Sequence, residues 1–221
     1  MDTSSKPSFY DVGDATGFSE KYPFAYSDAR RVLHHPCRLC GGWDEPMDRI
    51  ILTFNTNQGV RWPDCLGVCS HFMGLYVSER VLRNWDEAGI RRGPVIPATF
   101  SPPIPRRFRG VPPPTYYHLK GHKGVELDYE AMGCAAEFCP SCGLIQRMNP
   151  SLPDRIVFVE GSWDGSDVFK DSDTSRSSEF GSDRLLRLTQ ERGHTNFCFT
   201  PIERFGDPLA IGSANMTRRK V

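Results

Sequence analysis

Two short cysteine motifs offer the clearest chemistry in this sequence. Cys37-Arg-Leu-Cys40-Gly41 recurs as Cys139-Pro-Ser-Cys142-Gly143, 102 residues further on. Two thiolates separated by two residues can grip one cation, while backbone N–H groups of the tight turn point at the sulfurs. The glycine after the second cysteine tolerates the positive φ that such a turn needs. Each motif, here called a knuckle, therefore supplies half of a tetrahedral metal shell.

The two knuckles together predict one structural Zn²⁺ site formed by Cys37, Cys40, Cys139 and Cys142. Four thiolates leave no open position for water, so this ion would not be catalytic. In the usual module of this type the knuckles lie about 15–20 residues apart. The much longer separation here means that the metal would join distant segments of the chain. The alternatives are a redox dithiol and structural disulfides.

The other cysteines admit two interpretations. Cys65 and Cys69 are spaced so that they could hold a second ion with His71 or Cys134. The alternative is that they are ordinary small buried hydrophobic residues. Cys198 stands between two phenylalanines and is predicted to lie in the core. His34 and His35 precede the first knuckle and are competing ligands for it.

Several other segments recur in the same order as the knuckles. Asp48–Leu52 is echoed by Asp154–Phe158, and Ser78–Arg83 is matched by Ser182–Arg187. Each of the latter pair is followed by a glutamate and then a glycine. Because order and spacing agree as well as residue type, we infer an internal duplication of a unit of about one hundred residues. The alternative is chance similarity between short strings.

Local patterns predict the secondary structure of each half. Ser78 and Ser182 are good N-caps for two helices that precede Gly89 and Gly193, which suit left-handed C-caps. The predicted elements are strands over Arg49–Phe54, Arg155–Val159 and Phe197–Phe199, and helices over Glu79–Ala88 and Asp183–Arg192. The fold class is therefore α+β, with two similar sheet-plus-helix halves joined by the zinc site.

A proline-rich stretch separates these halves. Eight prolines lie between Pro94 and Pro114, a density that argues against a helix or a central strand. We expect an extended connector here, with a proline-motif ligand as the alternative. The predicted organisation is a first half over 1–93, the connector over 94–119, a second half over 120–203 and a C-terminal tail over 204–221.

Composition excludes several classes of function. The 221 residues include 27 basic and 27 acidic side chains, so the formal net charge is zero, which disfavours a nucleic-acid-binding protein. There is no apolar stretch of about 18 residues, as a membrane helix needs, and no secretory signal pattern near Met1. We therefore expect a cytoplasmic protein without a membrane partner. No nucleophile or phosphate-binding motif points to an enzyme.

The two knuckles, an early Phe9-Tyr10, the Asp167-Val168-Phe169 step and the helix over 182–192 resemble the myxobacterial double-CXXCG paralogous family. The resemblance extends over about residues 9–203. Members of that family are described as immunity proteins that protect a cell from a toxin delivered on contact by kin. The resemblance implies a non-catalytic protein that binds a cognate toxin, and it carries over only the four knuckle cysteines.

Charge suggests where such a partner could bind. Acidic residues prevail between Asp154 and Asp183, and we expect a loop over Trp163–Glu179 to face a basic toxin through Asp164, Asp167, Asp171 and Asp173. The alternative is a solvated loop without a partner. A competing function is a zinc-stabilised protein-interaction or nucleic-acid-binding module, which would use the arginine-rich stretch with Tyr116, Tyr117 and His118. A zinc enzyme is a third class.

Overall fold

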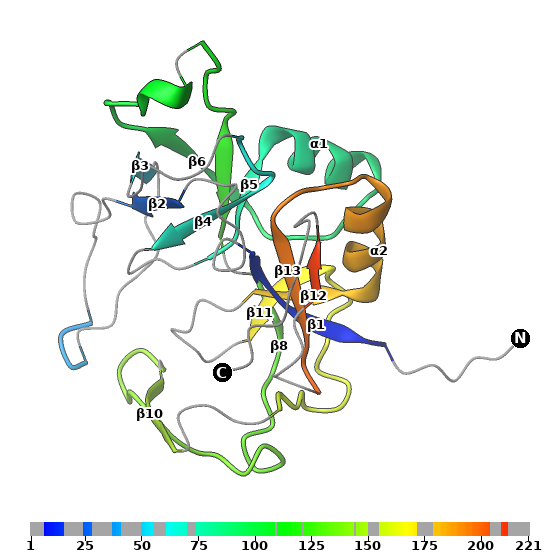
Figure 1. Cartoon of the computed structure of the whole chain (residues 1–221). Helices are drawn as coiled ribbons and strands as arrows, with labels where there is room; N and C mark the ends of the chain where they lie inside the picture. The colour runs from blue at the N-terminus through cyan, green and yellow to red at the C-terminus, as the bar shows by residue number, and fades with distance from the viewer. Residues whose placement is uncertain are drawn as a thin grey trace, which may run out of the picture.

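The computed structural model describes most of the chain (Figure 1). The described residues are 7–15, 24–27, 37–40, 50–54, 61–69, 74–108, 110–120, 122–143, 145–149, 155–171, 179–203 and 209–211. They form a mixed α+β structure made mainly of sheets, with two α-helices. The predicted α+β class is therefore confirmed.

The first sheet closes into a barrel. Its strands follow the order β2-β3-β6-β7-β5-β4 around the barrel. Their bounds are β2 Phe24–Ser27, β3 Ile50–Phe54, β4 Cys65–Cys69, β5 Tyr76–Ser78, β6 Val95–Phe100 and β7 Tyr116–Leu119. Leu52, Leu66, Tyr76 and Tyr116 fill its interior, each at most 1% exposed. These apolar and aromatic side chains make a closed core of their own.

The second sheet has six strands in the order β14-β13-β1-β12-β11-β8. Their bounds are β1 Phe9–Asp14, β8 Lys123–Val125, β11 Val168–Asp171, β12 Glu179–Ser182, β13 Phe197–Pro201 and β14 Leu209–Ile211. Phe9, Phe169, Phe180 and Ile202 pack together on one face of this sheet. A separate ribbon, β9 (Ala135–Phe138) with β10 (Ile145–Asn149), carries the second knuckle.

The two sheets share an order of pairings, although the chain crosses between them. In the first sheet, β2 pairs in parallel with β4, followed by antiparallel pairs β4–β5, β5–β7 and β7–β6. In the second, β8 pairs in parallel with β11, followed by antiparallel pairs β11–β12, β12–β1 and β1–β13. The N-terminal strand β1 thus lies in the second sheet, and β7 lies in the first. Cutting the chain between these halves would not separate the two sheets.

The prediction of a strand over Arg155–Val159 is wrong. Phe158 forms an isolated antiparallel bridge with Leu127, and the Ile156 N–H donates to the Ile202 carbonyl at 2.8 Å. No longer ladder forms in the described part of this segment. A turn that contains Gly161, with φ 77°, follows Val159 and ends the extended stretch. This segment is therefore held by a few hydrogen bonds and not by a ladder.

Both predicted helices are confirmed to within one residue. Helix α1 spans Glu79–Glu87 and α2 spans Asp183–Glu191. The hydroxyl oxygens of Ser78 and Ser182 accept the N–H of the residue three positions on, as N-caps do. Gly89 (φ 65°) and Gly193 (φ 59°) follow the helices in the left-handed region. These local signals mark where both helices begin and end, and packing against the core stabilises them.

The expectation that prolines exclude a sheet strand is wrong for part of the connector. Strand β6 is one of the barrel strands and pairs with β3 on one side and with β7 on the other. Ile96 and Ala98 are buried, while Pro97 between them is exposed. The strand alternates in the ordinary way and carries its proline on the outer face. The predicted strand through Phe197–Phe199 is confirmed as part of β13.

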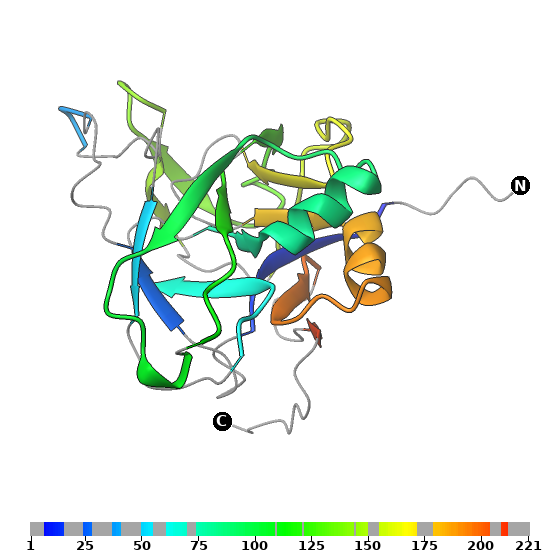
Figure 2. The ribbon, with the colours of Figure 1, turned by 90° about the horizontal axis from the view of Figure 1, so that it is seen from above.

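One hydrophobic core lies between the two sheets. The helices lie side by side, as both views show (Figure 2), and their apolar faces enter this core. It contains Val81, Trp85, Leu185 and Phe199. Because both halves contribute to it, the two halves are packed as one body.

Candidate metal centre

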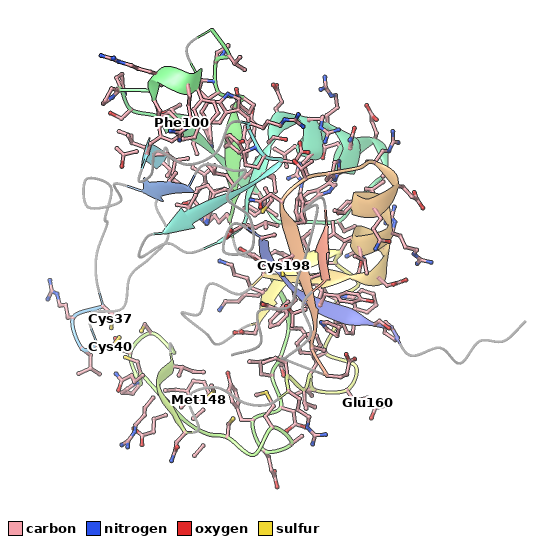
Figure 3. The ribbon with its side chains drawn as sticks, viewed as in Figure 1. Cys37, Cys40, Phe100, Met148, Glu160 and Cys198 are labelled. Carbon is pink, nitrogen blue, oxygen red and sulfur yellow. The ribbon has the colours of Figure 1, made fainter. Side chains whose placement is uncertain are left out.

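The knuckles come from opposite parts of the chain and meet at the edge of the molecule. Cys37 and Cys40 lie in a turn, and Cys139–Cys142 form the tip between β9 and β10. The Gly143 N–H donates to the Cys139 carbonyl at 2.8 Å and closes that tip. Figure 3 shows Cys37 and Cys40 above the ribbon that carries Met148. The predicted positive φ after the second cysteine is confirmed at Gly143, with 73°, whereas Gly41 lies outside the described residues.

The four sulfur atoms form a compact cluster. All four Sγ atoms lie within 4.8 Å of one another. The Cys37 and Cys139 sulfurs are 3.9 Å apart, and those of Cys40 and Cys142 are 3.5 Å apart. A tetrahedral shell with Zn–S bonds of about 2.3 Å places its sulfurs about 3.8 Å apart. The cluster could therefore hold a metal ion, and the predicted convergence of these four cysteines is confirmed.

The turns around the four cysteines prepare the thiols for a cation. Cys37, Cys40, Cys139 and Cys142 form no disulfide. Hydrogen bonds from the backbone of Cys40 and Leu39 lower the pKa of Cys37 to about 6. The backbone of Ser141 lowers the pKa of Cys139 in the same way, in spite of the opposing effect of burial. Both knuckles thus use turn N–H groups to stabilise thiolates, the form that binds metals.

Exposure differs from one sulfur to the next. Cys139 is buried, Cys37 and Cys40 are half-buried, and Cys142 is exposed. Leu39, between the cysteines of the first knuckle, is 62% exposed, and Phe138, just before the second, is 43% exposed. The cluster therefore lies at the surface rather than in a core.

The remaining cysteines do not join a second cluster among the described residues. Cys65 is 1% exposed and its Sγ donates to the Gly13 carbonyl at 3.7 Å. Cys134 is buried and its Sγ donates to the Met132 carbonyl. Cys198 is buried between phenylalanines, as predicted. The side chain of Cys69 and all of His34, His35 and His71 lie outside the described residues.

The predicted acidic partner surface is not assembled as expected. Asp167 and Asp171 are buried, with 4% and 5% exposure, so they cannot face a partner. Asp164 is partly exposed and pairs with His122 at 2.7 Å. Partial burial acts to raise the pKa of Asp164, but hydrogen bonds from Ser166 and His122 lower it overall. Asp173 lies outside the described residues.

Asp64 has a structural role that the sequence did not reveal. Its carboxylate accepts hydrogen bonds from the Ser78 hydroxyl at 3.0 Å and from Arg80. The N–H of Thr195, which lies in the second half of the chain, also donates to this carboxylate at 2.9 Å. Arg80 donates in addition to the Gly193 carbonyl just after α2. Asp64, Ser78 and Arg80, here called the first clasp, thereby tie α1 to the end of α2.

Asp167, in the second half, forms a matching set of contacts with the first half. It accepts from the Ser182 hydroxyl at 2.7 Å, from Arg184 at 3.1 Å and from the Arg91 N–H at 3.0 Å. Arg184 also donates to the Gly89 carbonyl just after α1. Asp167, Ser182 and Arg184 form the second clasp. The signal that could have found both clasps is an aspartate some fifteen residues before each repeated Ser-(Glu/Asp)-Arg.

The arginine-rich face of the competing function is also not formed as expected. Tyr116 and His118 are 0% and 1% exposed, so neither ring can stack on a base. Tyr117 is half-buried. In the described part of the chain no helix is long and apolar enough to cross a membrane. Comparison with protein-family models and with curated protein sequences finds no match.

Proposed function

We propose that this chain is a non-catalytic, cytoplasmic immunity protein, held by a structural Zn²⁺, that binds and neutralises a cognate bacterial toxin. The observation that carries the proposal is the convergence of the two CXXCG knuckles into one cluster. Paired knuckles are the feature on which the resemblance to the double-CXXCG family rests. A single metal site would account for both motifs.

Zinc is the ion that this donor set favours. Thiolate-only tetrahedral shells suit Zn²⁺, and the sulfur separations of 3.5 and 3.9 Å match such a shell. Cys37, Cys40, Cys139 and Cys142 would hold it. A shell completed by four thiolates has no position for water or substrate, so the ion would act as a staple between the two knuckles.

We also infer that the two halves arose by duplication, with one strand exchanged between them. Support comes from the pairing registers. Cys65 pairs with Val77 as Val168 pairs with Gly181, and Tyr117 pairs with Pro97 as Tyr10 pairs with Pro201. The reciprocal clasps add side-chain contacts to this correspondence. On this basis β1 and β7 are equivalent strands that changed places.

A protein built in this way suits binding. The exchanged strands, the shared core and the two clasps resist relative motion of the halves. A rigid scaffold lowers the entropic cost of forming a complex, because less of the surface must be ordered on binding. An immunity protein needs this property, since it must occupy its toxin rather than convert it.

The zinc assignment is tested by elemental analysis of protein purified without chelators. We expect one zinc per chain in the wild type and a large loss in C142S, which removes one ligand. The matched control is C134S, because Cys134 is buried near the second knuckle but outside the cluster. Wild-type protein that contains no metal would contradict the assignment.

The toxin assignment is tested by co-expression with the product of the neighbouring reading frame. If that product arrests growth alone, we expect this chain to restore growth and to co-purify with it. A toxin from an unrelated pair serves as the control and should still arrest growth. Continued arrest by the neighbouring product, with both proteins accumulating, would refute the proposed function.

A further inference from the structure

We propose that Cys40 and Cys142 form a peroxide-sensitive modification site, at which oxidation joins the two knuckles through a disulfide. The inference starts from the sulfur cluster and not from the identity of any toxin. Its metal-release arm alone rests on the proposed zinc.

Two short sulfur separations run between the knuckles. The Cys40 and Cys142 sulfurs are 3.5 Å apart, and the Cys37 and Cys139 sulfurs are 3.9 Å apart. A disulfide needs about 2.05 Å, so the closer pair must approach by roughly 1.5 Å. Turn residues at the tip of an exposed ribbon can make such a shift. The geometry thus places a bond between Cys40 and Cys142, across the two knuckles, within reach.

Exposure distinguishes the two cross-knuckle pairs. Cys142 is exposed and Cys40 is half-buried, whereas Cys139 of the other pair is only 2% exposed. A peroxide must reach the sulfur that it attacks, and oxidation follows accessibility as well as thiolate character. Cys142 is therefore the most accessible sulfur of the cluster, and Cys40, at 3.5 Å, is placed to resolve it.

The chemistry balances with a hydroperoxide as the oxidant. The Cys142 sulfur attacks one peroxide oxygen, the O–O bond breaks, and the second oxygen leaves as water or an alcohol, giving a sulfenic acid. The Cys40 sulfur then attacks the Cys142 sulfur, an S–S bond forms, and the S–O bond breaks. The departing hydroxide takes the remaining thiol proton and leaves as water. The two sulfurs together lose two electrons, which the peroxide gains.

Oxidation would replace the metal link between the knuckles with a disulfide. A disulfide between Cys40 and Cys142 removes two of the four thiolates, so a bound ion would be released. The same bond joins one cysteine of each knuckle, 102 residues apart in the sequence, so it holds the two knuckles together covalently. The ribbon β9–β10 would therefore stay attached to the first knuckle after the ion leaves.

Peptide mapping of the full-length protein tests this site. Trypsin cuts after Arg38, so Cys37 and Cys40 fall in different peptides. A glutamate-specific protease, which cuts after Glu137, separates Cys134 from the second knuckle. After treatment with hydrogen peroxide and without reductant, we expect the first disulfide to join Leu39–Arg49 to the fragment that contains Cys142. Fragmentation between Cys139 and Cys142 identifies the linked sulfur. Zinc released to a chromophoric chelator should rise in parallel.

Several outcomes would overturn the proposal. A first disulfide within either knuckle, a first bond that involves the Cys139 sulfur, or oxidation to sulfonic acids without a disulfide each refutes it. C37S is expected to retain the linkage and C40S to lose it, while buried Cys65 and Cys198 should remain thiols in the wild type. If the wild type carries no metal but still forms the Cys40–Cys142 bond, the modification site stands and the zinc assignment fails.

Discussion

Asp64 and Asp167 occupy matching places in the two halves, but they hold the opposite half by different means. The Asp64 carboxylate accepts both the N–H of Thr195, at 2.9 Å, and its hydroxyl, at 3.0 Å. The Asp167 carboxylate accepts the N–H of Arg91 at 3.0 Å, while the Arg91 side chain lines an open pocket of about 370 Å³. The first clasp therefore gains a side-chain contact that the second lacks at this position.

The interiors of the two sheets differ in a similar way. Phe9 and Phe180 of the second sheet stand where the first sheet has Tyr116 and Tyr76, according to the matching registers. The Tyr116 hydroxyl donates to the Pro63 carbonyl. Matching positions thus keep their aromatic bulk, while the first half adds polar links to the loops around it. The comparison teaches that packing is shared and that hydrogen bonding distinguishes the halves.

The largest effect is expected from removing the first clasp. D64A leaves the buried Ser78 hydroxyl and the Thr195 N–H without their acceptor, and each buried donor left unsatisfied costs about 1–3 kcal/mol. The Arg80 side chain is 46% exposed, so the loss of its ion pair adds less. Burial acts to raise the pKa of Asp64, but hydrogen bonds from Arg80 and Thr195 outweigh it and lower that pKa. D167A should cost less, because Asp167 lacks a counterpart of the Thr195 hydroxyl bond. Chemical denaturation measures both free energies of unfolding.

The control for this pair is D164A. Asp164 pairs with His122 at the surface, with side chains 36% and 40% exposed, so its loss should cost less than about 1 kcal/mol. Equal losses for D64A and D164A would show that the first clasp contributes little to stability. A larger loss for D167A than for D64A would reverse the order inferred from the hydrogen bonds.

A second difference predicts a dependence on pH. His194 follows α2 where Ile90 follows α1, and both are buried. Burial lowers the pKa of His194 to about 4, from an ordinary value of 6.5. Because the folded pKa lies below the unfolded one, this contribution to stability is complete above about pH 6.5 and is lost as the pH falls toward 4. At about 1.4 kcal/mol per pKa unit, the loss reaches at most about 3.5 kcal/mol.

The measurement compares two proteins rather than one. Asn84 lies 2.9 Å from the His194 ring, and its own counterpart in α2 is Leu188. The double variant N84L/H194I therefore copies the Ile90 and Leu188 environment without leaving an unpaired amide. Unfolding free energies at pH 7 and pH 4.5 should fall more in the wild type than in this variant. The same fall in both would assign the pH dependence to carboxylates elsewhere.

Local signals in the sequence predicted the helices and the cysteine cluster. A Ser N-cap, an acidic first turn and a following glycine lie within a dozen residues, so α1 and α2 could be placed closely. The knuckles could be paired because the same five-residue motif occurs twice. In these cases the deciding interactions are short-range or are marked by a rare residue type.

Long-range pairing could not be predicted in this way. Nothing in Phe9–Asp14 indicates that it pairs with β12 and β13, which lie far along the chain. The same holds for the burial of Asp167, since its acidic neighbours suggested an exposed loop while Ser182 and Arg184 stabilise it inside. Proline counting failed at β6 because one outward-facing proline, Pro97, is compatible with a barrel strand. Each of these outcomes depends on contacts with residues that lie elsewhere in the sequence.

The smallest predicted effect tests the hydrogen bonding inside the first barrel. Y116F gives this position the residue that Phe9 provides in the second sheet, and it leaves the Pro63 carbonyl without its donor. The aromatic packing is kept, so the expected loss is about 1 kcal/mol, the usual net value of one hydrogen bond. The neighbouring Y117F is the control, because Tyr117 is half-buried and should change the unfolding free energy by less. If Y116F is as stable as the wild type, the hydrogen bond from Tyr116 to Pro63 is not a source of stability.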